Sequence, residues 1–472
     1  MTKIPDITTN FSEWYHHVVY EAELADQAPV RGCMVVRPYG CALWEQMQSV
    51  LDAQFKATGH QNAAFPMLIP MSFLQKEKEH VAGFSPELAV VTHAGGKKLE
   101  EELVIRPTSE TIIHHMFAQW IRSWRDLPMK INQWCSVIRW EMRPRPFLRT
   151  TEFWWQEGHT AHETAQEALE EAELMHRIYR DFMQDYLAIP VVAEIKPEHE
   201  KFAGGDRTYT LEGMTLDGRA LQMGTSHLIS QNFAKAFNMV FQDREGGLSY
   251  PHLTSWGVST RMIGGLIMTH GDAKGLIMPP RIAPIQIVII PIFKAENRDP
   301  IMRVAHELKT QLGMTYRVHL DADEQETPGA KFYRWELKGV PVRIEIGPRD
   351  LQNESVTIVN RVTGEKTPCA YGQIPHSMPL ILDKIQKELY ERALRNRAEK
   401  WFVTDASLSE VGEMLQEKPG FYQVGWSKEP KTPDLLKAYG ATIRCILPER
   451  KSTRCFHTGA ESVCDIIVAK AY

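Results

Sequence analysis

The chain has 472 residues, of which 43% are hydrophobic and 24% charged, and its formal net charge is −5 at pH 7. This length exceeds what one hydrophobic core normally serves, so we expect two or three domains, and the acidic balance excludes a protein that coats nucleic acid along its whole surface. No apolar run reaches the roughly 18 residues of a membrane span and the start lacks the pattern of a secretory leader, which predicts a cytoplasmic protein without membrane contact.

Helices and strands are expected along the first half of the chain. Apolar residues at helical spacing predict a helix over 40–58, and an apolar run between prolines predicts a strand within 62–73. A second helix is expected to begin within 107–110, where proline, threonine and serine precede a glutamate. Residues 163–187 have the clearest amphipathic helical pattern in the chain.

A proline-rich stretch at 279–285 indicates a domain boundary. The pattern that follows is strand, helix, strand, helix, strand, strand, which predicts a small α/β domain of about 100 residues. A further helix, expected over 381–400, opens the last segment. We therefore predict three domains, at residues 1–283, 284–380 and 381–472.

The stretch RWEMRPRPFLRTTEFWWQEGHT, residues 139–160, gathers arginine and aromatic side chains in an acidic protein. If its ends are strands, Arg139 and Glu141 share one face, and Arg149 and Phe153 share a face of the returning strand. Guanidinium groups bind phosphate, a carboxylate binds an exocyclic amine and an aromatic ring stacks on a base, so this hairpin suits a nucleotide. By itself the pattern is also compatible with a charged surface hairpin.

Three further stretches combine small, polar and charged residues, at 106–110, 220–227 and 255–261. Alone, the first is equally typical of a capped helix start, the second of a turn and the third of a buried helix with a charge at its end.

Taken together and in this order, the four stretches resemble the motifs of class II aminoacyl-tRNA synthetases. The hairpin of residues 139–160 matches the R-x-E strand and the returning R-x-x-x-F strand of that family's second motif, and Arg261 matches the single arginine of its third. Residues 43–70 resemble its first motif, a helix and a proline-ended strand at the dimer interface. The segments RPTSE, GTSH, TSWGVSTR and THGDAKGL look like prolyl-tRNA synthetases of the archaeal and eukaryotic type, and this resemblance covers nearly the whole chain.

The resemblance implies a mixed α/β fold. Its parts are an α+β catalytic domain with an antiparallel sheet flanked by helices, an α/β anticodon-binding domain and a small C-terminal α/β domain. It also implies that the protein activates proline with ATP and transfers the prolyl group to the 3′-terminal adenosine of tRNA(Pro). The nucleophile of the first step is the substrate's carboxylate, so the enzyme aligns substrates and neutralises charge, with Arg139 and Arg261 as the catalytic residues.

The same resemblance assigns the substrate contacts. The residues expected to bind ATP are Arg139, Glu141, Arg149, Phe153, Gln222, Thr225, Ser259 and Arg261. Those expected to bind proline are Thr108, Glu110, Arg139, Trp155, His159, Phe202 and His227. For His159 and His227, residue type alone fits a core histidine equally well.

Mg²⁺ is expected with ATP, and a second copy of the chain is expected as the partner in a homodimer. Some bacterial relatives carry a hydrolytic editing insertion between the second and third motifs. Here only roughly 110 residues separate Arg149 from Arg261, which predicts no editing domain in this chain.

Arg343 and Glu345 share a face of a predicted strand in the second domain. A guanidinium and a carboxylate suit the edges of guanine, the middle base of proline anticodons, so this pair is predicted to contact the anticodon.

The last segment departs from the family, whose members often carry four zinc-binding cysteines there. Cys455 is followed by Thr458 where the second cysteine of a pair is expected, and the first pair is absent around 425–427. We therefore expect no zinc.

Three alternatives remain from the residues. The chain could be a class II synthetase for threonine, serine, glycine or histidine, a catalytically silent relative that serves as a binding module, or a general RNA-binding protein. Intact arginines at 139 and 261 argue against the second, and the net negative charge argues against the third.

Overall fold

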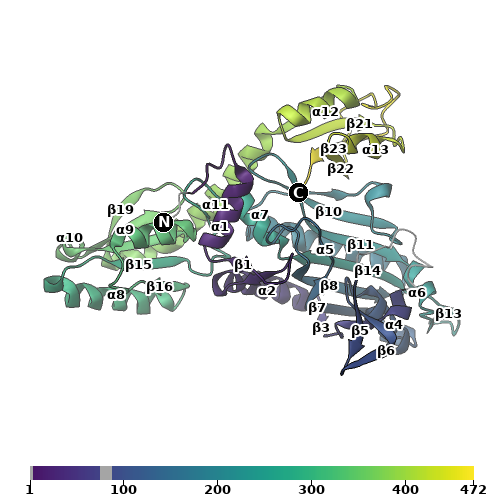
Figure 1. Cartoon of the computed structure of the whole chain (residues 1–472), viewed down its shortest axis with the longest axis horizontal. Helices are drawn as coiled ribbons and strands as arrows, with labels where there is room; N and C mark the ends of the chain where they lie inside the picture. The colour runs from purple at the N-terminus through teal and green to yellow at the C-terminus, as the bar shows by residue number, and fades with distance from the viewer. Residues whose placement is uncertain (1–3, 75–87) are drawn as a thin grey trace.

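The computed structural model describes residues 4–74 and 88–472, which form three regions (Figure 1). A large sheet with its helices occupies one side, a smaller sheet with helices the other, and the long helix α11 leads from the smaller one to a C-terminal unit. The three regions agree with the mixed α/β class that was predicted.

The main sheet has 11 strands in the order β20-β21-β23-β22-β9-β10-β11-β14-β8-β7-β3. From β9 to β7 every neighbouring pair is antiparallel. The strands in this part are β3 (Gln61–Asn62), β7 (Met129–Ile138), β8 (Glu152–His162), β9 (Val192–Ile195), β10 (Arg207–Met214), β11 (Ala220–Ser230) and β14 (His252–Ser259). The antiparallel sheet predicted for the catalytic domain is therefore confirmed.

Helices cover this sheet and place the polar stretches at its open face. They are α1 (Phe11–Glu21), α2 (Pro38–Ala57), α4 (Glu110–Trp120), α5 (Ala165–Asp185), α6 (Asn232–Ala236) and α7 (Arg261–His270). Helix α5 packs on the sheet with buried residues such as Met175 and Tyr179, and Thr164 and Glu167 form a capping box at its start. The helices predicted over 40–58 and 163–187 are confirmed.

Smaller strand pairs and one three-stranded sheet lie beside the main sheet. They comprise β1 (Ala25–Gln27), β2 (Met34–Val36), β4 (Leu68–Pro70), β5 (Ala89–Ala94), β6 (Lys97–Ile105), β12 (Phe241–Gln242) and β13 (Leu248–Ser249). The strand predicted within 62–73 is present only as the short β4.

The second region is a five-stranded sheet in the order β16-β15-β17-β18-β19. Its elements are β15 (Ile287–Pro291), α8 (Arg298–Gly313), β16 (Val318–Leu320), α9 (Pro328–Leu337), β17 (Val342–Ile346), α10 (Pro348–Gln352), β18 (Ser355–Asn360) and β19 (Lys366–Ala370). The alternation predicted after the proline-rich stretch is confirmed, with α10 and β19 in addition. An apolar core of its own, including Ile289, Ile301 and Ile344, fills this region.

Helix α11 (Ile374–Glu399) begins earlier than the helix predicted over 381–400 and runs across the predicted division at residue 380. The C-terminal unit follows with β20 (Trp401–Val403), α12 (Leu408–Glu417), β21 (Phe421–Trp426), α13 (Thr432–Lys437), β22 (Ala441–Ile446) and β23 (Cys464–Lys470). Its strands continue the main sheet through a single pairing of Ile446 with Ile195. The division into three domains at 283 and 380 remains a prediction.

The hairpin of β7 and β8 is present, but its strands are shorter than expected. Strand β7 ends at Ile138 and β8 begins at Glu152, so Arg139, Glu141 and Arg149 lie in the connecting segment rather than on strands. The two prolines between them remove backbone donors that a strand would need.

Within the described residues, no helix is long and apolar enough to cross a membrane. All seven cysteines are free.

Candidate functional site

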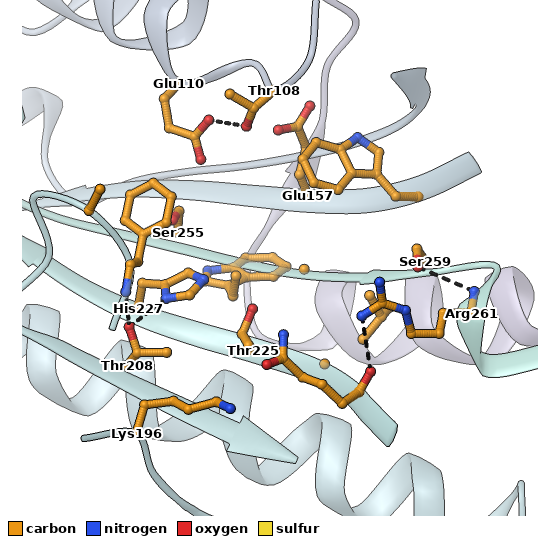
Figure 2. A pocket seen from close by; sticks show the side chains of 18 of the residues that line it. Thr108, Glu110, Glu157, Lys196, Thr208, Thr225, His227, Ser255, Ser259 and Arg261 are labelled. Atoms are coloured by element: carbon orange, nitrogen blue, oxygen red, sulfur yellow. Dashed lines mark hydrogen bonds between the residues drawn. The ribbon is translucent and has the colours of Figure 1, made fainter. Parts of the chain in front are cut away.

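A cavity of about 520 Å³ opens on the face of the main sheet between β8, β11 and β14 (Figure 2). It collects residues that are far apart in sequence and that were predicted to bind substrates. Those lining it are Thr108, Glu110, Arg139, Phe153, Trp155, His159, Phe202, Gln222, Thr225, His227, Ser259 and Arg261. Glu141 and Arg149 do not line the cavity.

Strand β8 supplies one wall through every second residue. Phe153, Trp155, Glu157 and His159 all line the cavity because successive strand residues point to opposite faces. Glu157 was not predicted, although the same period of two places it between Trp155 and His159. Across the sheet, β14 contributes Ser255, which was also missed.

The start of α4 forms one corner of the cavity. Thr108 precedes the helix and donates its hydroxyl to the Glu110 carboxylate, and both side chains are buried. The preceding Arg106 fixes this turn, since its guanidinium donates to the backbone oxygens of Phe65 at 2.7 Å and Ser136 at 3.0 Å. Two buried oxygens are thereby held facing the cavity, where they can accept hydrogen bonds from a cationic amine.

Glu157 and His159 form a buried pair beneath this corner. His159 Nε2 lies 3.1 Å from Glu157 Oε2, and Gln133 Nε2 donates to Glu157 Oε1 at 2.8 Å. Burial opposes both charges, but the hydrogen bond between the two side chains prevails. It lowers the pKa of Glu157 and raises the pKa of His159. His159 is therefore a partnered residue at the cavity wall and not an isolated core histidine.

His227 faces the cavity from β11, beside Phe202 and on the side away from Arg261 (Figure 2). Their ring centroids are 4.8 Å apart, and Thr208 Oγ1 lies 3.0 Å from His227 Nδ1. Burial, with a smaller contribution from the charge of His159, lowers the pKa of His227 to about 3. His227 is thus a neutral imidazole at physiological pH, and with Phe202 it presents a mostly apolar surface.

Arg139 reaches the cavity between two aromatic rings. Its guanidinium carbon is 5.6 Å from the centroid of Phe153 and 5.3 Å from that of Trp155, and Nε donates to the Pro107 oxygen at 2.9 Å. Solvent reaches the side chain through the open cavity, while protein surrounds its other sides. Desolvation on those sides lowers the pKa of Arg139, and the charges of Glu110 and Glu157 partly offset this effect. The group stays cationic and has free donors for an anion.

Arg261 is the first residue of α7 and is anchored by three hydrogen bonds. Its amide donates to Ser259 Oγ at 3.2 Å, Nε to the Leu148 oxygen at 3.1 Å and Nη1 to the Gln222 oxygen at 3.4 Å. Burial, followed by repulsion from Arg139 and other arginines, lowers its pKa to about 10. No carboxylate pairs with Arg261 in the described residues, so an anion would find an uncompensated cation at the start of a helix.

Glu141 and Arg149 lie outside the cavity and contact one another. Arg149 Nε is 3.6 Å from Glu141 Oε2, and Glu141 Oε1 accepts the Arg143 amide at 2.8 Å. Arg149 is largely exposed, so this pair can rearrange at little cost.

Arg343 and Glu345, predicted for the second domain, are brought together on β17. Arg343 Nε donates to Glu345 Oε1 at 3.0 Å, and Lys366 Nζ donates to Glu345 Oε2 at 3.1 Å. Both side chains are largely buried, and Arg343 also packs over the ring of Phe332. They lie on the five-stranded sheet and do not line the cavity of the main sheet.

Among residues 4–74 and 88–472 no group of three or more His, Cys, Asp or Glu side chains is arranged to hold a metal ion. At the position where cysteine pairs were considered, Ser427 Oγ donates to Cys455 Sγ at 3.2 Å. In the cavity, Glu110 and Glu157 are already hydrogen-bonded within the protein.

Comparison with known proteins places these observations in a family. Residues 92–270 match the tRNA synthetase class II core domain (G, H, P, S and T), and residues 286–378 match an anticodon binding domain. The chain is 48% identical to "Proline--tRNA ligase 2" of Clostridioides difficile, covering 100% of this chain and 98% of that protein. It is 50% identical to "Proline--tRNA ligase" of Symbiobacterium thermophilum, covering 98% and 97%.

A solved structure is similar over the same extent. The crystal structure of prolyl-tRNA synthetase from Cryptosporidium parvum complexed with halofuginone and AMPPNP superposes with a TM-score of 0.94. It is 40% identical to this chain, and the match covers 99% of both chains.

Proposed function

The chain belongs to the proline–tRNA ligases, a family of class II aminoacyl-tRNA synthetases, and on that premise we propose how the residues of its cavity divide the reaction. The enzyme joins proline to tRNA at the expense of ATP. The observation that carries the proposal is that one cavity holds a carboxylate corner, an aromatic wall and two arginines drawn from three separated motifs.

We propose that Arg139 and Arg261 neutralise the charge that builds up as the proline carboxylate attacks the α-phosphorus of ATP. The attack forms prolyl-adenylate and releases pyrophosphate. Arg139 would hold the α-phosphate and the proline carboxylate, and Arg261 the γ-phosphate. Such fixed donors act without reorganising during the reaction, and removing one typically costs about 100-fold to 1,000-fold in kcat. Phe153 would stack on adenine.

The remaining ATP contacts are proposed around these two arginines. Gln222, Thr225 and Ser259 line the cavity beside Arg261. Glu141 and Arg149 would reach the nucleotide from the adjoining loop, which requires their mutual contact to loosen when ATP binds.

The proline pocket is proposed at the α4 corner. Thr108 and Glu110 would accept the two N–H donors of the prolyl ammonium, and Trp155, Phe202 and His227 would contact the ring. His159, paired with Glu157, also lines the cavity there and is proposed as part of the same pocket. Because His227 is neutral, it adds no repulsion toward the cationic substrate.

Mg²⁺ is proposed to arrive with ATP. Glu110 and Glu157 are already hydrogen-bonded within the protein, and no group of three metal-binding side chains is found in the described residues, so the ion would be held mainly through ATP. When bound, the ion neutralises part of the phosphate charge.

The second region is proposed to bind the anticodon of tRNA(Pro), with Arg343 and Glu345 contacting its central guanine. A guanine edge offers both an acceptor pair and a donor, so it would replace bonds that the two side chains make with one another and with Lys366.

A homodimer is proposed through the segment that resembles the family's first motif. Within it, Met67 is 41% exposed and Leu68 is 44% exposed, an unusual share for large apolar side chains on one short strand segment. Light scattering at several protein concentrations measures the molecular mass and so tests for the dimer.

We propose the cytoplasm as the location, since tRNA charging serves protein synthesis there.

Proline-dependent exchange of pyrophosphate into ATP tests the proposed chemistry. We expect exchange with proline and not with threonine, serine, glycine or histidine, and a loss of at least about 100-fold in Arg139→Ala and Arg261→Ala. Absence of proline-dependent exchange in the wild-type protein contradicts the proposal, and unchanged exchange in both variants contradicts the assigned roles.

We further propose that the chain has no editing activity of its own. Residues 150–260 form β8, α5, β9, β10, β11, α6 and β14 with their connections, so this segment is used by the main sheet and its helices. A pocket sized for proline discriminates against the smaller alanine by only about 1–3 kcal/mol per methylene. The isolated protein should therefore form Ala-tRNA(Pro) slowly and not hydrolyse it, and measurable hydrolysis contradicts this.

A further inference from the structure

A buried cluster of three charged side chains joins the C-terminal unit to the wall of the active-site cavity. Glu212 of β10 has no exposed surface, and its Oε2 accepts hydrogen bonds from Arg444 Nε at 3.0 Å and Nη2 at 2.8 Å. Its other oxygen, Oε1, lies 3.0 Å from Lys196 Nζ and accepts the Thr210 hydroxyl at 2.8 Å. We call Lys196, Glu212 and Arg444 the charge triad.

The triad carries one more positive than negative charge. Glu212 stays ionised although burial opposes it, because Arg444 and Lys196 lower its pKa. Burial opposes the charge of Arg444, but Glu212 and, more weakly, Glu200 raise its pKa, and Glu200 also lines the cavity. An anion bound in the cavity would further stabilise the buried ammonium of Lys196. Lys196 lines the cavity beside Thr208 (Figure 2), with its side chain 2% exposed and its ammonium against Glu212, whereas Arg444 reaches Glu212 from the C-terminal strand β22.

The triad is adjacent to the end of the cavity where Arg261 lies. Glu212 pairs with Gln222 across β10 and β11, and the Gln222 backbone oxygen accepts a hydrogen bond from Arg261. After burial and the nearer arginines, Arg444 also contributes to the lowered pKa of Arg261. Glu212 partly offsets this contribution, so Arg261 senses the Arg444–Glu212 pair of the C-terminal junction.

We propose that Lys196 binds the polyphosphate of ATP and that Arg444, acting through Glu212, is a positioning residue for it. This inference rests on the proposed adenylate-forming function. Arg444 occupies one carboxylate oxygen with two donors, which leaves Glu212 only one oxygen for Lys196. Without Arg444, Glu212 would be free to pair fully with Lys196 and withdraw its charge from the cavity.

Kinetics of proline-dependent pyrophosphate exchange, with ATP and proline varied separately, test this inference. Lys196→Met and Arg444→Met are each expected to raise the KM for ATP about tenfold, equivalent to 1.4 kcal/mol, and to leave the KM for proline within about twofold. Arg444→Lys, which keeps the charge but not the paired donors, should fall between wild type and Arg444→Met.

The double variant Lys196→Met/Arg444→Met separates positioning from simple support of the fold. If Arg444 acts through Lys196, the double variant should have the same KM for ATP as Lys196→Met alone. Effects that multiply, or a wild-type KM for ATP in Lys196→Met, overturn the inference. Because Lys196→Met leaves the Arg444–Glu212 pair intact, this measurement stays informative even where Arg444→Met folds poorly.

Arg361→Met is the matched control. Arg361 also donates through two nitrogens to one carboxylate, that of Asp272, at 2.8 Å each, and this pair ties the second region to the segment after α7. The Arg361→Met variant should have lower thermal stability and the wild-type KM for ATP. A tenfold rise in the KM for ATP of this control also counts against the inference. Loss of proline-dependent exchange in the wild type would instead refute the proposed function itself.

Discussion

Arg143 and Arg145 lie on one loop but in different surroundings. Arg143 is exposed, and its backbone amide contacts Glu141. Arg145 is partly covered and packs over the ring of Tyr472, at 5.3 Å from its centroid. Neither lines the cavity and neither has a proposed contact with ATP or proline, so we expect adenylate formation to proceed without them and assign both to the acceptor end of the tRNA.

Arg143→Ala is therefore expected to separate the two half-reactions. Proline-dependent pyrophosphate exchange should stay within about twofold of wild type, whereas transfer of proline to tRNA should slow about tenfold because a phosphate contact worth roughly 1.4 kcal/mol is lost. Single-turnover transfer from preformed prolyl-adenylate measures the second step. Equal loss in both steps contradicts the assignment.

At the level of residues, the family resemblance assigned Phe153, Trp155 and His159 to substrates, and all three line the cavity. The strand alternation predicted for Arg139, Glu141 and Arg149 was wrong because these residues lie outside β7 and β8. Applied within β8, the same alternation would have found Glu157. Lys196 could not have been found in this way, because its neighbours give no periodic pattern that points at the cavity. Its role depends on Arg444, which lies more than two hundred residues away in the chain.

Strands β8 and β14 approach so closely at one point that only glycine fits. A Cβ on Gly158 would lie 2.1 Å from two ring atoms of Trp256, which is almost completely buried. The indole cannot retreat because Phe55 and Tyr179 pack against it.

Gly158→Ala should destabilise the protein by about 1–3 kcal/mol through overpacking. We expect a lower melting temperature together with weaker substrate binding, since Trp256 also lines the cavity. Gly329→Ala in α9 is the control, because a methyl group added there would meet no atom within 4 Å and alanine favours helix. Equal melting temperatures for the two variants contradict the packing argument.

The C-terminal unit is held by an apolar cluster that includes Val411, Val424 and Ile466. Burial raises the pKa of the Cys455 thiol, but hydrogen bonds from Ser427 and Thr458 outweigh it and lower the pKa to about 7. Hydroxyl groups thus satisfy a sulfur that, in a metal site, would bind an ion.

A chelator should consequently leave the melting temperature of the protein unchanged, and elemental analysis should find less than stoichiometric zinc. Zinc at one equivalent per chain, or a fall in melting temperature on chelation, contradicts this prediction.

At the level of elements, helices with strong apolar periodicity were predicted within a few residues, as for α2 and α5. The ends of β7 and β8 were not, because the connecting segment is extended without pairing as a strand. Helix α11 begins earlier than predicted because Pro375 occupies its first turn, where a missing N–H costs nothing, and the apolar residues that follow are buried.

For the whole molecule, buried neutral histidines predict a loss of stability in mild acid. Burial lowers the pKa of His162 to about 4 and that of His270 to about 3. In the unfolded chain both take up a proton near pH 6.5, so the unfolded state binds more protons below that pH. Each histidine should lower the free energy of unfolding by about 1.4 kcal/mol for each pH unit of acidification between pH 6.5 and pH 4.

Melting temperatures between pH 7.5 and pH 5 measure this effect. The melting temperatures should fall as the pH drops. His159 acts in the opposite direction, because its raised pKa means that its protonation stabilises the folded state. His162→Gln keeps a hydrogen-bonding group beside Thr160 and should make the fall shallower. A melting temperature that rises on acidification contradicts the prediction.

Composition and periodicity predicted the order of the regions along the chain, but they did not predict which residues of different regions contact one another. Pairing of Ile446 with Ile195 and of Arg444 with Glu212 depends on how two distant strands align. No local pattern encodes that alignment, because each strand alone is only an alternating segment.

The junction between β9 and β22 also has a consequence for biosynthesis. During translation the catalytic sheet emerges roughly two hundred residues before β22, an interval of about 10 to 40 s at usual elongation rates. Throughout that interval β9 is an open sheet edge, and Glu212 has Lys196 but not yet Arg444. A ribosome that pauses late in this message prolongs exposure of an edge that can pair with other nascent chains. Slow codons anywhere between the end of β14 and β22 should therefore lower the yield of folded enzyme more than slow codons before β9.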